Sequence, residues 1–433
     1  MNTRNRNLLF VSLILATFAA AGHKVFSRTA TSTFAVTATS LSPAEKPRST
    51  PANSAQAPTF KAQFVSTVPG QAVHAPSIVE LKDGSLRAVW FSGSREGAGD
   101  VTIQTSVLNV ISQRWGLETT VFNRAQLETG LLRYVKKIGN PVIARALDGS
   151  LHLWVVNVSL GGWAGSAITW ARSVDEGATW STPKRLVTSP FLNISTLVKG
   201  APVPMADGSV SLPAYHEFIT KFGEVLHVSA KGEMLDKTRI PGSHNSLQPV
   251  VLVVSTTEAR AYMRASQGGK VVMSSTLDAG KTWTEGAAIN LPNPDSALAG
   301  LVSSNGNNWV ALNPSAQGRQ SLALFKAGSL GTFDGTRPIF VEGSELSLET
   351  SNLKLPIADH AALLGRELKA RGASDADIQA YVASSARQLC GPTDCVQEFS
   401  YPFLLQTRDG SLHLIYTWHR SRIKHVRLGL LND

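Results

Sequence analysis

The sequence predicts an all-β fold, a six-bladed β-propeller, because one hairpin pattern recurs about every fifty to sixty residues. In each copy an apolar run leads through a turn into a second, alternating run, which is typical of a β-hairpin. Most copies carry Asp-Gly in the turn, while one carries Asn-Gly and one has lost the pair. The copies begin at Pro76, Pro141, Pro202, Pro249, Leu298 and Pro402.

A second motif, a turn that ends in tryptophan, supports four strands in each repeat. It occurs in "SVDEGATW" (173–180) and again in "STLDAGKTW" (275–283), some tens of residues after a hairpin of the first kind. An Asp side chain accepts hydrogen bonds from the backbone ahead of it and Gly tolerates positive φ, so the motif predicts a tight turn of a further hairpin. Four strands per repeat are typical of a propeller blade, whereas the repetition disfavours the alternative, a β-sandwich. The matching residues are Asp175, Gly177 and Trp180, and Asp278, Gly280 and Trp283.

One segment breaks the β pattern. Between about 350 and 396 the apolar residues follow a helical period, which predicts a short helical insertion in or after the fifth blade. It ends at the only two cysteines, Cys390 and Cys395, which would form a disulfide in an exported protein or remain free thiols otherwise. Their spacing offers too few ligands for a metal site, and we expect neither a metal nor a cofactor.

The N-terminus predicts export. The apolar run 8–21, preceded by basic residues and ending in Ala19 and Ala21, is typical of a signal peptide. The run is short for a membrane span, which needs ~20 apolar residues, although an uncleaved membrane anchor is the alternative. We therefore divide the chain into a signal peptide or anchor (1–21), a disordered linker rich in Ser, Thr, Ala and Pro (22–60) and the propeller (61–433). The predicted location is periplasmic or secreted.

The charge balance favours anionic partners. The 433-residue chain has a formal net charge of +10 with 17% charged and 43% hydrophobic residues. No basic run is interleaved with aromatic residues, so we expect no nucleic acid as a partner. The basic stretch "WHRSRIKHVRL" (418–428) is interpreted as the solvated side of the closing strand.

The repeated S/T-x-D-x-G-x-x-W turn, with a degenerate copy in "SVLNVISQRW", resembles the Asp-box of sialidases. Over residues 70–428, apart from the insertion, the chain is similar to bacterial predicted neuraminidases with BNR-type repeats. The segments that carry this resemblance include "HAPSIVELKDGSLRAVWFSGSREGAGDV", "QPVVL", "LPNPDSALAGL" and "SYPFLLQTRDGSLHLIYTWHRSRIKHV". The resemblance implies that the Asp-boxes lie on outer hairpins, while the site lies at the axial face of the propeller.

The resemblance also implies an arginine clamp for a substrate carboxylate. Arg264 and Arg319 are similar to the second and third arginines of sialidases, and guanidinium groups pair with carboxylates in a bidentate manner. His74 stands where the first arginine is expected, and it binds an anion only when protonated. If its pKa stays near the reference ~6.5, affinity should rise as the pH falls from about 8 to 6. Arg95 is a further candidate for substrate binding.

Tyr401 in "SYP" stands where sialidases keep their nucleophilic tyrosine. The glutamate that usually takes its proton is replaced by Gln248, which cannot act as a base. Either another acid substitutes, with Glu217 as the candidate, or Tyr401 is only a wall of the pocket. Asp100 with Val101 resembles the Asp-Ile pair that follows the sialidase acid/base. Glu96 and Asp100, on the loop "GSREGAGDV", are therefore the remaining catalytic candidates.

These residues predict an exo-glycosidase that resembles sialidases and acts on a terminal, acidic sugar of a glycan. The alternative is a non-catalytic propeller that binds carbohydrate or another protein, and both Gln248 and His74 favour it.

Overall fold

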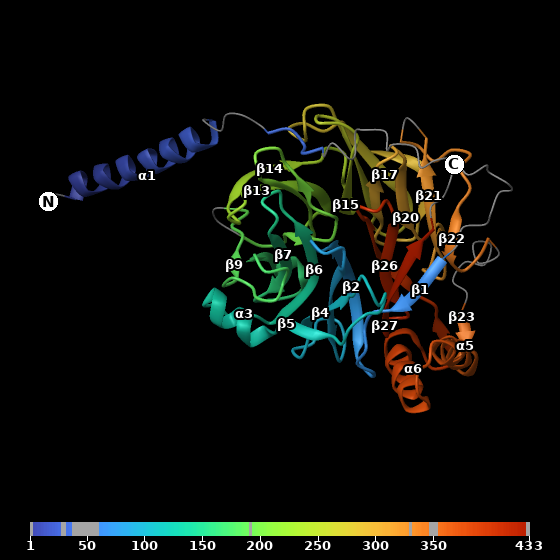
Figure 1. The fold of residues 1–433 in the computed structure, drawn as a ribbon. Coiled ribbons are helices and arrows are strands. Elements are labelled where there is room, and N and C mark those ends of the chain that lie inside the picture. The colour runs from blue at the N-terminus through green and yellow to red at the C-terminus, as the bar shows by residue number, and fades with distance from the viewer. Residues whose placement is uncertain are drawn as a thin grey trace.

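The computed structural model describes residues 3–26, 32–36, 60–189, 193–328, 331–345 and 354–429. Within these ranges, six antiparallel sheets form the blades of a propeller, as the sequence predicted (Figure 1). In blades one, two, four and five, consecutive strands pair with one another, so the innermost strand comes first and the outermost strand last.

The strands follow the hairpin repeats closely. Blade one holds β2 (Ala72–Glu80), β3 (Leu86–Gly93), β4 (Thr102–Leu108) and β5 (Thr119–Phe122), and blade two holds β6 (Lys137–Arg145), β7 (Leu151–Val158), β8 (Ser166–Ser173) and β9 (Lys184–Arg185). Blade three holds β10 (Leu197–Val198), β11 (Val203–Pro204), β12 (Val210–His216), β13 (Phe222–Val228) and β14 (Met234–Arg239), and blade four holds β15 (Ser246–Val253), β16 (Ala259–Ala265), β17 (Gly269–Thr276) and β18 (Ala287–Asn293).

The remaining two blades lie on either side of the insertion. Blade five holds β19 (Ala299–Val302), β20 (Asn308–Leu312), β21 (Leu322–Ala327) and β22 (Ile339–Glu342), and blade six holds β25 (Phe399–Gln406), β26 (Leu412–Trp418), β27 (Arg422–Leu428) and β1 (Phe60–Phe64). Two short helical segments connect strands outside the insertion, α3 (Arg124–Leu131) and η1 (Trp163–Gly165).

The ring closes through β1, which comes from the N-terminal end yet pairs with β27 in the last blade (Figure 1). Phe60 lies opposite Leu428 and Phe64 opposite Lys424. Because β1 covers it, β27 is not an edge strand, and the interpretation of 418–428 as a solvated side is wrong. Its polar residues are mostly buried, among them His419, Arg422, Lys424 and His425.

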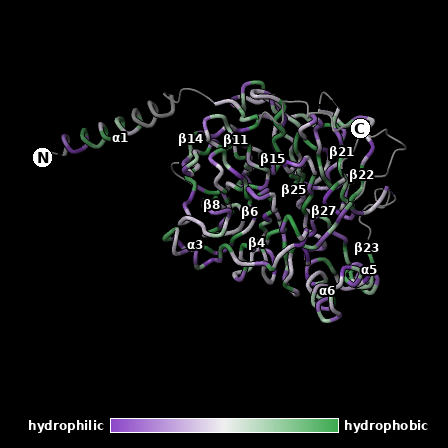
Figure 2. Tube along the Cα trace, viewed as in Figure 1, coloured by the Kyte–Doolittle hydropathy of each residue, from purple (hydrophilic) through white to green (hydrophobic). Residues whose placement is uncertain are grey.

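The core lies between the blades, and the inner strands are buried on both faces, as in β7, where all eight residues are buried. Alternation of hydrophobic and hydrophilic residues along the chain is visible in Figure 2. The buried hydrophobic residues form several clusters that join neighbouring blades, as expected for a ring of packed sheets. The largest fully buried side chains include Trp90, Trp154, Trp418, Tyr215, Tyr262 and Tyr416.

The predicted helical insertion is present between blades five and six. It consists of β23 (Lys354–Pro356), α5 (Ile357–Ala370), α6 (Asp375–Leu389) and β24 (Asp394–Val396). Leu364 and Leu368 of α5 and Tyr381 of α6 pack against the core of blades five and six. The side chain of Ser374 accepts a hydrogen bond from the backbone N–H of Asp377 and so caps α6.

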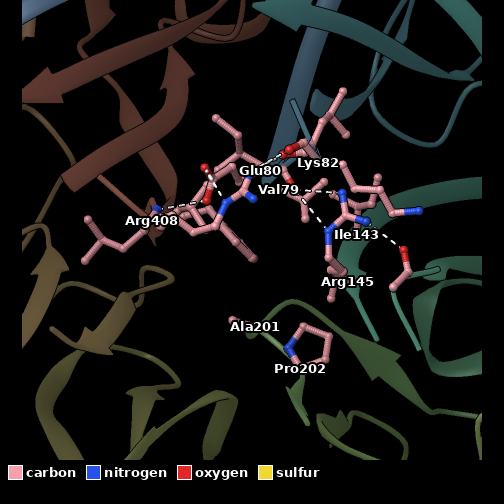
Figure 3. Close-up of a pocket in the computed structure, with 15 residues that line it drawn as sticks. Val79, Glu80, Lys82, Ile143, Arg145, Ala201, Pro202 and Arg408 are labelled. Carbon is pink, nitrogen blue, oxygen red and sulfur yellow. Dashed lines mark hydrogen bonds and ion pairs between the residues drawn. The ribbon is translucent and has the colours of Figure 1, made fainter. Parts of the chain in front are cut away.

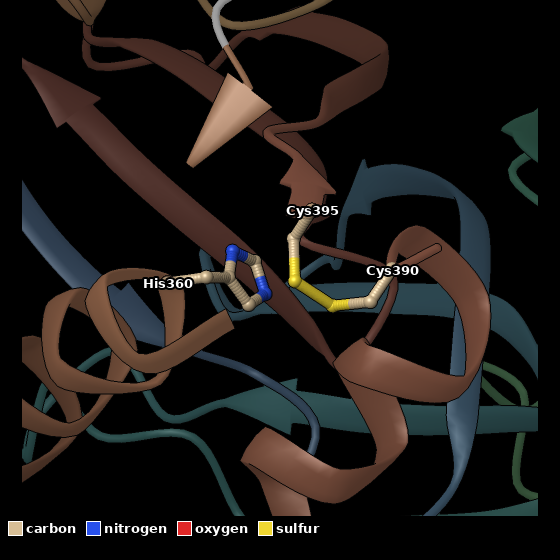
Figure 4. A group of neighbouring side chains, drawn as sticks. All are labelled: His360, Cys390 and Cys395. Atoms are coloured by element: carbon tan, nitrogen blue, oxygen red, sulfur yellow. A yellow bond between two sulfur atoms is a disulfide. The ribbon is translucent and has the colours of Figure 1, made fainter. Parts of the chain in front are cut away.

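Cys390 and Cys395 form a disulfide at the end of the insertion, as the sequence predicted for an exported chain (Figure 4). The buried imidazole of His360 lies beside the two sulfur atoms, and its Nε2 bonds the hydroxyl of Ser385. Because the sulfurs are bonded to each other, they are not thiolates, and the imidazole is the one conventional metal ligand left in this group of three.

The N-terminal segment forms α1 (Thr3–Phe26), which projects from the propeller with the apolar residues between Leu8 and Phe18 exposed (Figure 1). No helix in the described part of the chain is long and apolar enough to cross a membrane. Residues 32–36 do not fit the predicted disordered linker, since Phe34 is buried and pairs with Met205 in an isolated bridge. The remainder of that predicted linker, apart from residues 22–26 and Phe60, lies outside the described residues.

Both Asp-box turns lie between the third and fourth strands of their blades, away from the axis, as the resemblance implied. In blade four, Asp278 accepts hydrogen bonds from the backbone N–H and the hydroxyl of Thr282 and from the hydroxyl of Thr276. Trp283 is buried beside the turn. The same contacts recur around Asp175 in blade two, so the aspartates stabilise turns.

We expect Asp278→Ala to lower the free energy of unfolding by about 1–2 kcal/mol, because backbone and hydroxyl donors lose their acceptor. Ligand affinity of the folded protein should stay unchanged, since the turn is remote from the axis. Chemical denaturation and ligand titration of the same preparation check both points. A large loss of affinity at unchanged stability would instead place the Asp-box in the binding site.

Candidate functional site at one end of the axis

Four inner strands share an unusual backbone feature at one end of the axis. In each strand the residue directly before a proline has positive φ. These residues are Ala75 (54°), Asn140 (41°), Gln248 (53°) and Tyr401 (53°). The pairing register of β2, β6, β15 and β25 shifts at these residues, which marks a β-bulge. Non-glycine residues in the left-handed region are uncommon, and such strain concentrates at functional sites.

Three of these residues belong to one hydrogen-bond network with Tyr215 of blade three. Asn140 Nδ2 donates to the Tyr215 hydroxyl over 3.2 Å, and Gln248 Nε2 lies 3.4 Å from the same oxygen. Gln248 Nε2 also donates to the hydroxyl of Tyr401 over 3.0 Å. Residues from blades two, three, four and six therefore converge, which no stretch of local sequence could bring about.

The orientation of the Gln248 amide follows from its neighbours. Arg264 Nη1 donates to Gln248 Oε1 over 2.9 Å, and a guanidinium can only donate. The amide nitrogen must therefore face Tyr401 and donate to its phenol oxygen. Gln248 stabilises negative charge on that oxygen but cannot accept its proton.

Arg264 and Arg319, the two arginines singled out by the resemblance, lie close to this network. Arg264 Nε donates to Asp295 Oδ1 over 2.6 Å, and Arg319 Nη2 donates to the backbone oxygen of the same residue over 2.9 Å. Asp295 thus links the two arginines, and its own positive φ of 58° places it in a strained loop before β19.

A third arginine, Arg420, enters from the turn between β26 and β27. Its Nε donates to Glu398 Oε1 over 2.7 Å, and Arg319 Nη1 lies 3.4 Å from the same oxygen. Burial alone would raise the pKa of Glu398, but the Arg420 and Arg319 guanidiniums outweigh it and hold that pKa well below its usual range. Glu398 therefore stays ionised and fixes two arginines. Among the described residues, the Nη2 atoms of Arg264 and Arg420 have no protein hydrogen bond, so they remain available to a ligand.

His74 does not serve as the third cation of the clamp. Its ring is buried, with Nδ1 3.0 Å from the Thr417 hydroxyl, and it packs 4.1 Å from the ring of Tyr401. Burial, reinforced by the positive charge of Arg420, lowers the pKa of His74 well below its usual range. The expectation that His74 acquires charge between pH 8 and 6 is therefore wrong, and the nearby Arg420 supplies a permanent charge.

Two of the candidate carboxylates lie near the arginines. Glu96 Oε2 accepts a hydrogen bond from Arg420 Nη1 over 2.9 Å at the exposed mouth of the site. Glu217 is partly buried, and that burial raises its pKa against the opposing charges of Lys221 and Arg264. A carboxyl group whose pKa is raised by burial is suited to proton transfer.

Asp100 and Arg95 do not join this network in the described structure. Asp100 accepts hydrogen bonds from the backbone N–H and the hydroxyl of Ser94, so its carboxylate joins the two ends of the loop on which it lies. It lines a separate polar cavity together with Glu118. Arg95 is exposed on the same loop.

Sequence reasoning missed several site residues. Glu398 could have been suspected from its place three residues before Tyr401, and Arg420 from the basic run that was instead assigned to a solvated face. The others carried no sequence signal, because an Asn, Asp or Tyr in a strand-rich chain is common. The missed residues are Asn140, Tyr215, Asp295, Glu398 and Arg420.

A large cavity of ≈ 490 Å³ lies elsewhere, at the ends of β2, β6 and β25 opposite the bulges (Figure 3). Its floor is apolar, and its rim charges are already paired, since Arg408 bonds Glu80 and Arg145 bonds Glu176. None of the network residues described above lines this cavity. The network of polar and charged side chains therefore lies at the other end of the axis.

Comparison with known proteins gives a consistent result. The model of the BNR repeat-like domain matches residues 84–414. A sialidase from Bacteroides fragilis is 30% identical over 147 residues, which is 31% of this chain and 25% of that protein. The chain thus spans about a quarter of the length of the curated relative that it matches.

Solved structures show the same fold at low identity. A Hadza microbial sialidase has a TM-score of 0.57 at 16% identity, over 82% of this chain and 65% of that chain. The intramolecular trans-sialidase from Ruminococcus gnavus has a TM-score of 0.56 at 11% identity, over 85% and 95% of the two chains. A protein of unknown function from Dyadobacter fermentans has a TM-score of 0.60 at 11% identity, over 85% and 98%.

Proposed function

The chain belongs to the BNR repeat-like domain family, and from this membership we propose that it is an exported exo-glycosidase that removes a terminal, acidic sugar from a glycan. The sialidase-like propeller fold supports a glycosidase-like function. The observation that carries the proposal is the meeting of Arg264, Arg319 and Arg420 beside Tyr401. The Ruminococcus gnavus neighbour was solved with oseltamivir carboxylate, a ligand that bears the same charged group.

The arginines would bind the carboxylate of the sugar, with Nη2 of Arg264 and Arg420 as its donors. Charge-assisted hydrogen bonds of this kind fix both the position and the orientation of a planar anion. The sugar ring would then lie over Tyr401, and the glycan would extend toward Glu96 at the mouth. An uncharged terminal sugar would leave the guanidiniums without a partner and bind more weakly.

In the proposed reaction the phenol oxygen of Tyr401 attacks the anomeric carbon. The bond from that carbon to the glycan oxygen breaks, and the glycan oxygen takes a proton from Glu96. The phenol proton passes through one water to Glu217, whose raised pKa suits it as the acceptor. A water molecule then cleaves the tyrosyl–sugar bond, its proton returns to Glu96, and Tyr401 recovers its proton from Glu217.

A second candidate function is carbohydrate binding without hydrolysis. The specific observation that favours it is the Gln248 amide, which donates to Tyr401 and cannot take its proton. In that case the same clamp holds an acidic sugar, and Tyr401 forms only a wall of the pocket.

Export remains part of the proposal. The N-terminal sequence supports it, and a disulfide persists in an oxidising compartment such as the periplasm or the extracellular space. Whether residues 1–21 are removed or hold the protein at a membrane surface follows from N-terminal sequencing of the mature protein.

The decisive experiment compares a fluorogenic sialoside, a glucuronide and an uncharged galactoside as substrates, with free sialic acid titrated calorimetrically. Hydrolysis of an acidic substrate, lost in Tyr401→Phe by about 10²-fold or more while sialic acid still binds, supports the enzyme. Binding without hydrolysis supports the second candidate. Equal behaviour toward charged and uncharged sugars would rule out both forms of the carboxylate clamp.

A further inference from the structure

Lys199 occupies, in blade three, the position that bears site residues in other blades. Pro76, Pro141 and Pro402 each stand seven residues before the Asp of their hairpin turn, Asp83, Asp148 and Asp409. In blade three the residue seven positions before Asp207 is Gly200, so Lys199 is the counterpart of Ala75, Asn140 and Tyr401. The repeat therefore puts a lysine into the ring of residues around the axis.

The inner strand of blade three is interrupted at this point. β10 ends at Val198 and β11 begins at Val203, so residues 199–202 leave the regular ladder. A Cβ atom on Gly200 would lie 2.2 Å from the backbone oxygen of Pro249, which directly follows Gln248. Only glycine permits this close approach, and the interruption thereby turns Lys199 inward.

The ammonium group of Lys199 joins two other blades across the axis. It donates to the backbone oxygen of Leu298, at the head of blade five, over 3.1 Å, and to that of Pro402, directly after Tyr401. The ring of Phe403 lies 5.8 Å from the nitrogen. Lys199 is 4% exposed, and no carboxylate lies within ion-pair distance of it in the described part of the chain.

An ammonium group in this position is electrostatically unusual. The elements packed against it, β15, β25 and the start of β19, present backbone oxygens and an aromatic ring, and the ionisable groups nearest along them are Tyr401 and Asp295. Burial lowers the pKa of Lys199 to about 7. A negative charge bound nearby would favour its protonated form.

We propose that Lys199 is a positioning residue of the anion site: its ammonium group ties blades three, five and six together behind Tyr401, and a ligand carboxylate binds tightly only while that group is protonated. This inference rests on the proposed function. It assigns a role to a residue that does not itself touch the ligand.

The test is the affinity for free sialic acid between pH 5.5 and 9, measured by calorimetry. If a bound anion raises the pKa of Lys199 by about one unit, wild-type affinity falls about tenfold as the pH rises through neutrality. Lys199→Gln, which keeps a donor but no charge, and Lys199→Met should both bind weakly with no such step. His74→Ala should retain the step, because His74 is uncharged throughout this range.

A flat wild-type profile, or a step that survives in Lys199→Gln, would overturn the proposal. If neither variant folds, wild-type calorimetry in two buffers of different ionisation enthalpy decides, since binding must take up protons near neutral pH. Absence of proton uptake there would equally contradict the role of Lys199.

A ligand-free measurement separates this inference from the proposed function. An unfolded lysine keeps its proton up to about pH 10.4, whereas the folded one releases it near neutrality. Between these values the unfolded state binds more protons, so the melting temperature of the wild type should rise relative to Lys199→Met as the pH increases from about 7 to 10. If no sugar binds but this rise occurs, the proposed function fails, while the titration of buried Lys199 near neutral pH is supported. A difference in melting temperature that does not change with pH would refute that titration.

Discussion

An Arg420→Ala variant is expected to lose about 10²-fold in affinity for free sialic acid and for any other acidic sugar that the wild type binds. Hydrogen bonds to charged groups contribute about 1.5–3 kcal/mol each, and 1.4 kcal/mol corresponds to a factor of ten. The variant also removes the principal counter-charge of Glu398, which lies buried between Arg420 and Arg319. An unpaired buried carboxylate would draw Arg319 away from the ligand and enlarge the loss.

The matched control is Arg427→Ala on β27, the strand that directly follows the turn with Arg420. Arg427 pairs with Asp409 at the far end of β27 and has no contact with the clamp. We expect its removal to leave affinity within about twofold of the wild type, because exposed pairs contribute only ~0.2–1 kcal/mol. Calorimetry with sialic acid and with an uncharged analogue measures both effects. Equal losses for the two sugars in Arg420→Ala would mean that Arg420 supports the fold rather than the carboxylate.

A Gln248→Glu variant is expected to increase hydrolysis of an acidic glycoside by about 10²-fold or more. The introduced glutamate would accept the proton of Tyr401 where Gln248 now donates to its oxygen, and a positioned general base contributes typically ~10²–10⁴-fold. Arg264, which donates to the same side chain, would hold the new carboxylate in place. Steady-state turnover of a fluorogenic sialoside measures the gain.

The double variant Gln248→Glu with Tyr401→Phe tests whether the gain acts through the tyrosine. If the introduced carboxylate activates Tyr401, the double variant returns to the rate of Tyr401→Phe alone, which is full coupling in a double-mutant cycle. Gln248→Met serves as the second control, because it fills the space without a donor or a base. A rate increase that persists without the phenol would assign the nucleophile to another group.

The sequence by itself determined the fold, because blades are built from local hairpins and the turns of these hairpins have recognisable sequence motifs. The turns at Asp83, Asp148 and Asp409, and the Asp-boxes at Asp175 and Asp278, set the register and number of the strands. The helical insertion and its disulfide could be predicted for the same reason, since helical periodicity and cysteine spacing are local. Tyr401, Arg264 and Arg319 could be proposed as site residues only because the resemblance to sialidases pointed to their positions.

Only the tertiary structure decided the composition of the site. Arg420 lies in the turn before β27, a strand that looks exposed until β1 covers it. Glu398 is ionised only because two distant arginines surround it, and Lys199 crosses the axis to reach Leu298 and Pro402. The charge of His74 was decided in the same way, by burial that its sequence neighbours do not reveal. Hydrogen-bond donors and dielectric environment depend on which blades meet at the axis, and ring closure brings those blades together regardless of their separation in sequence.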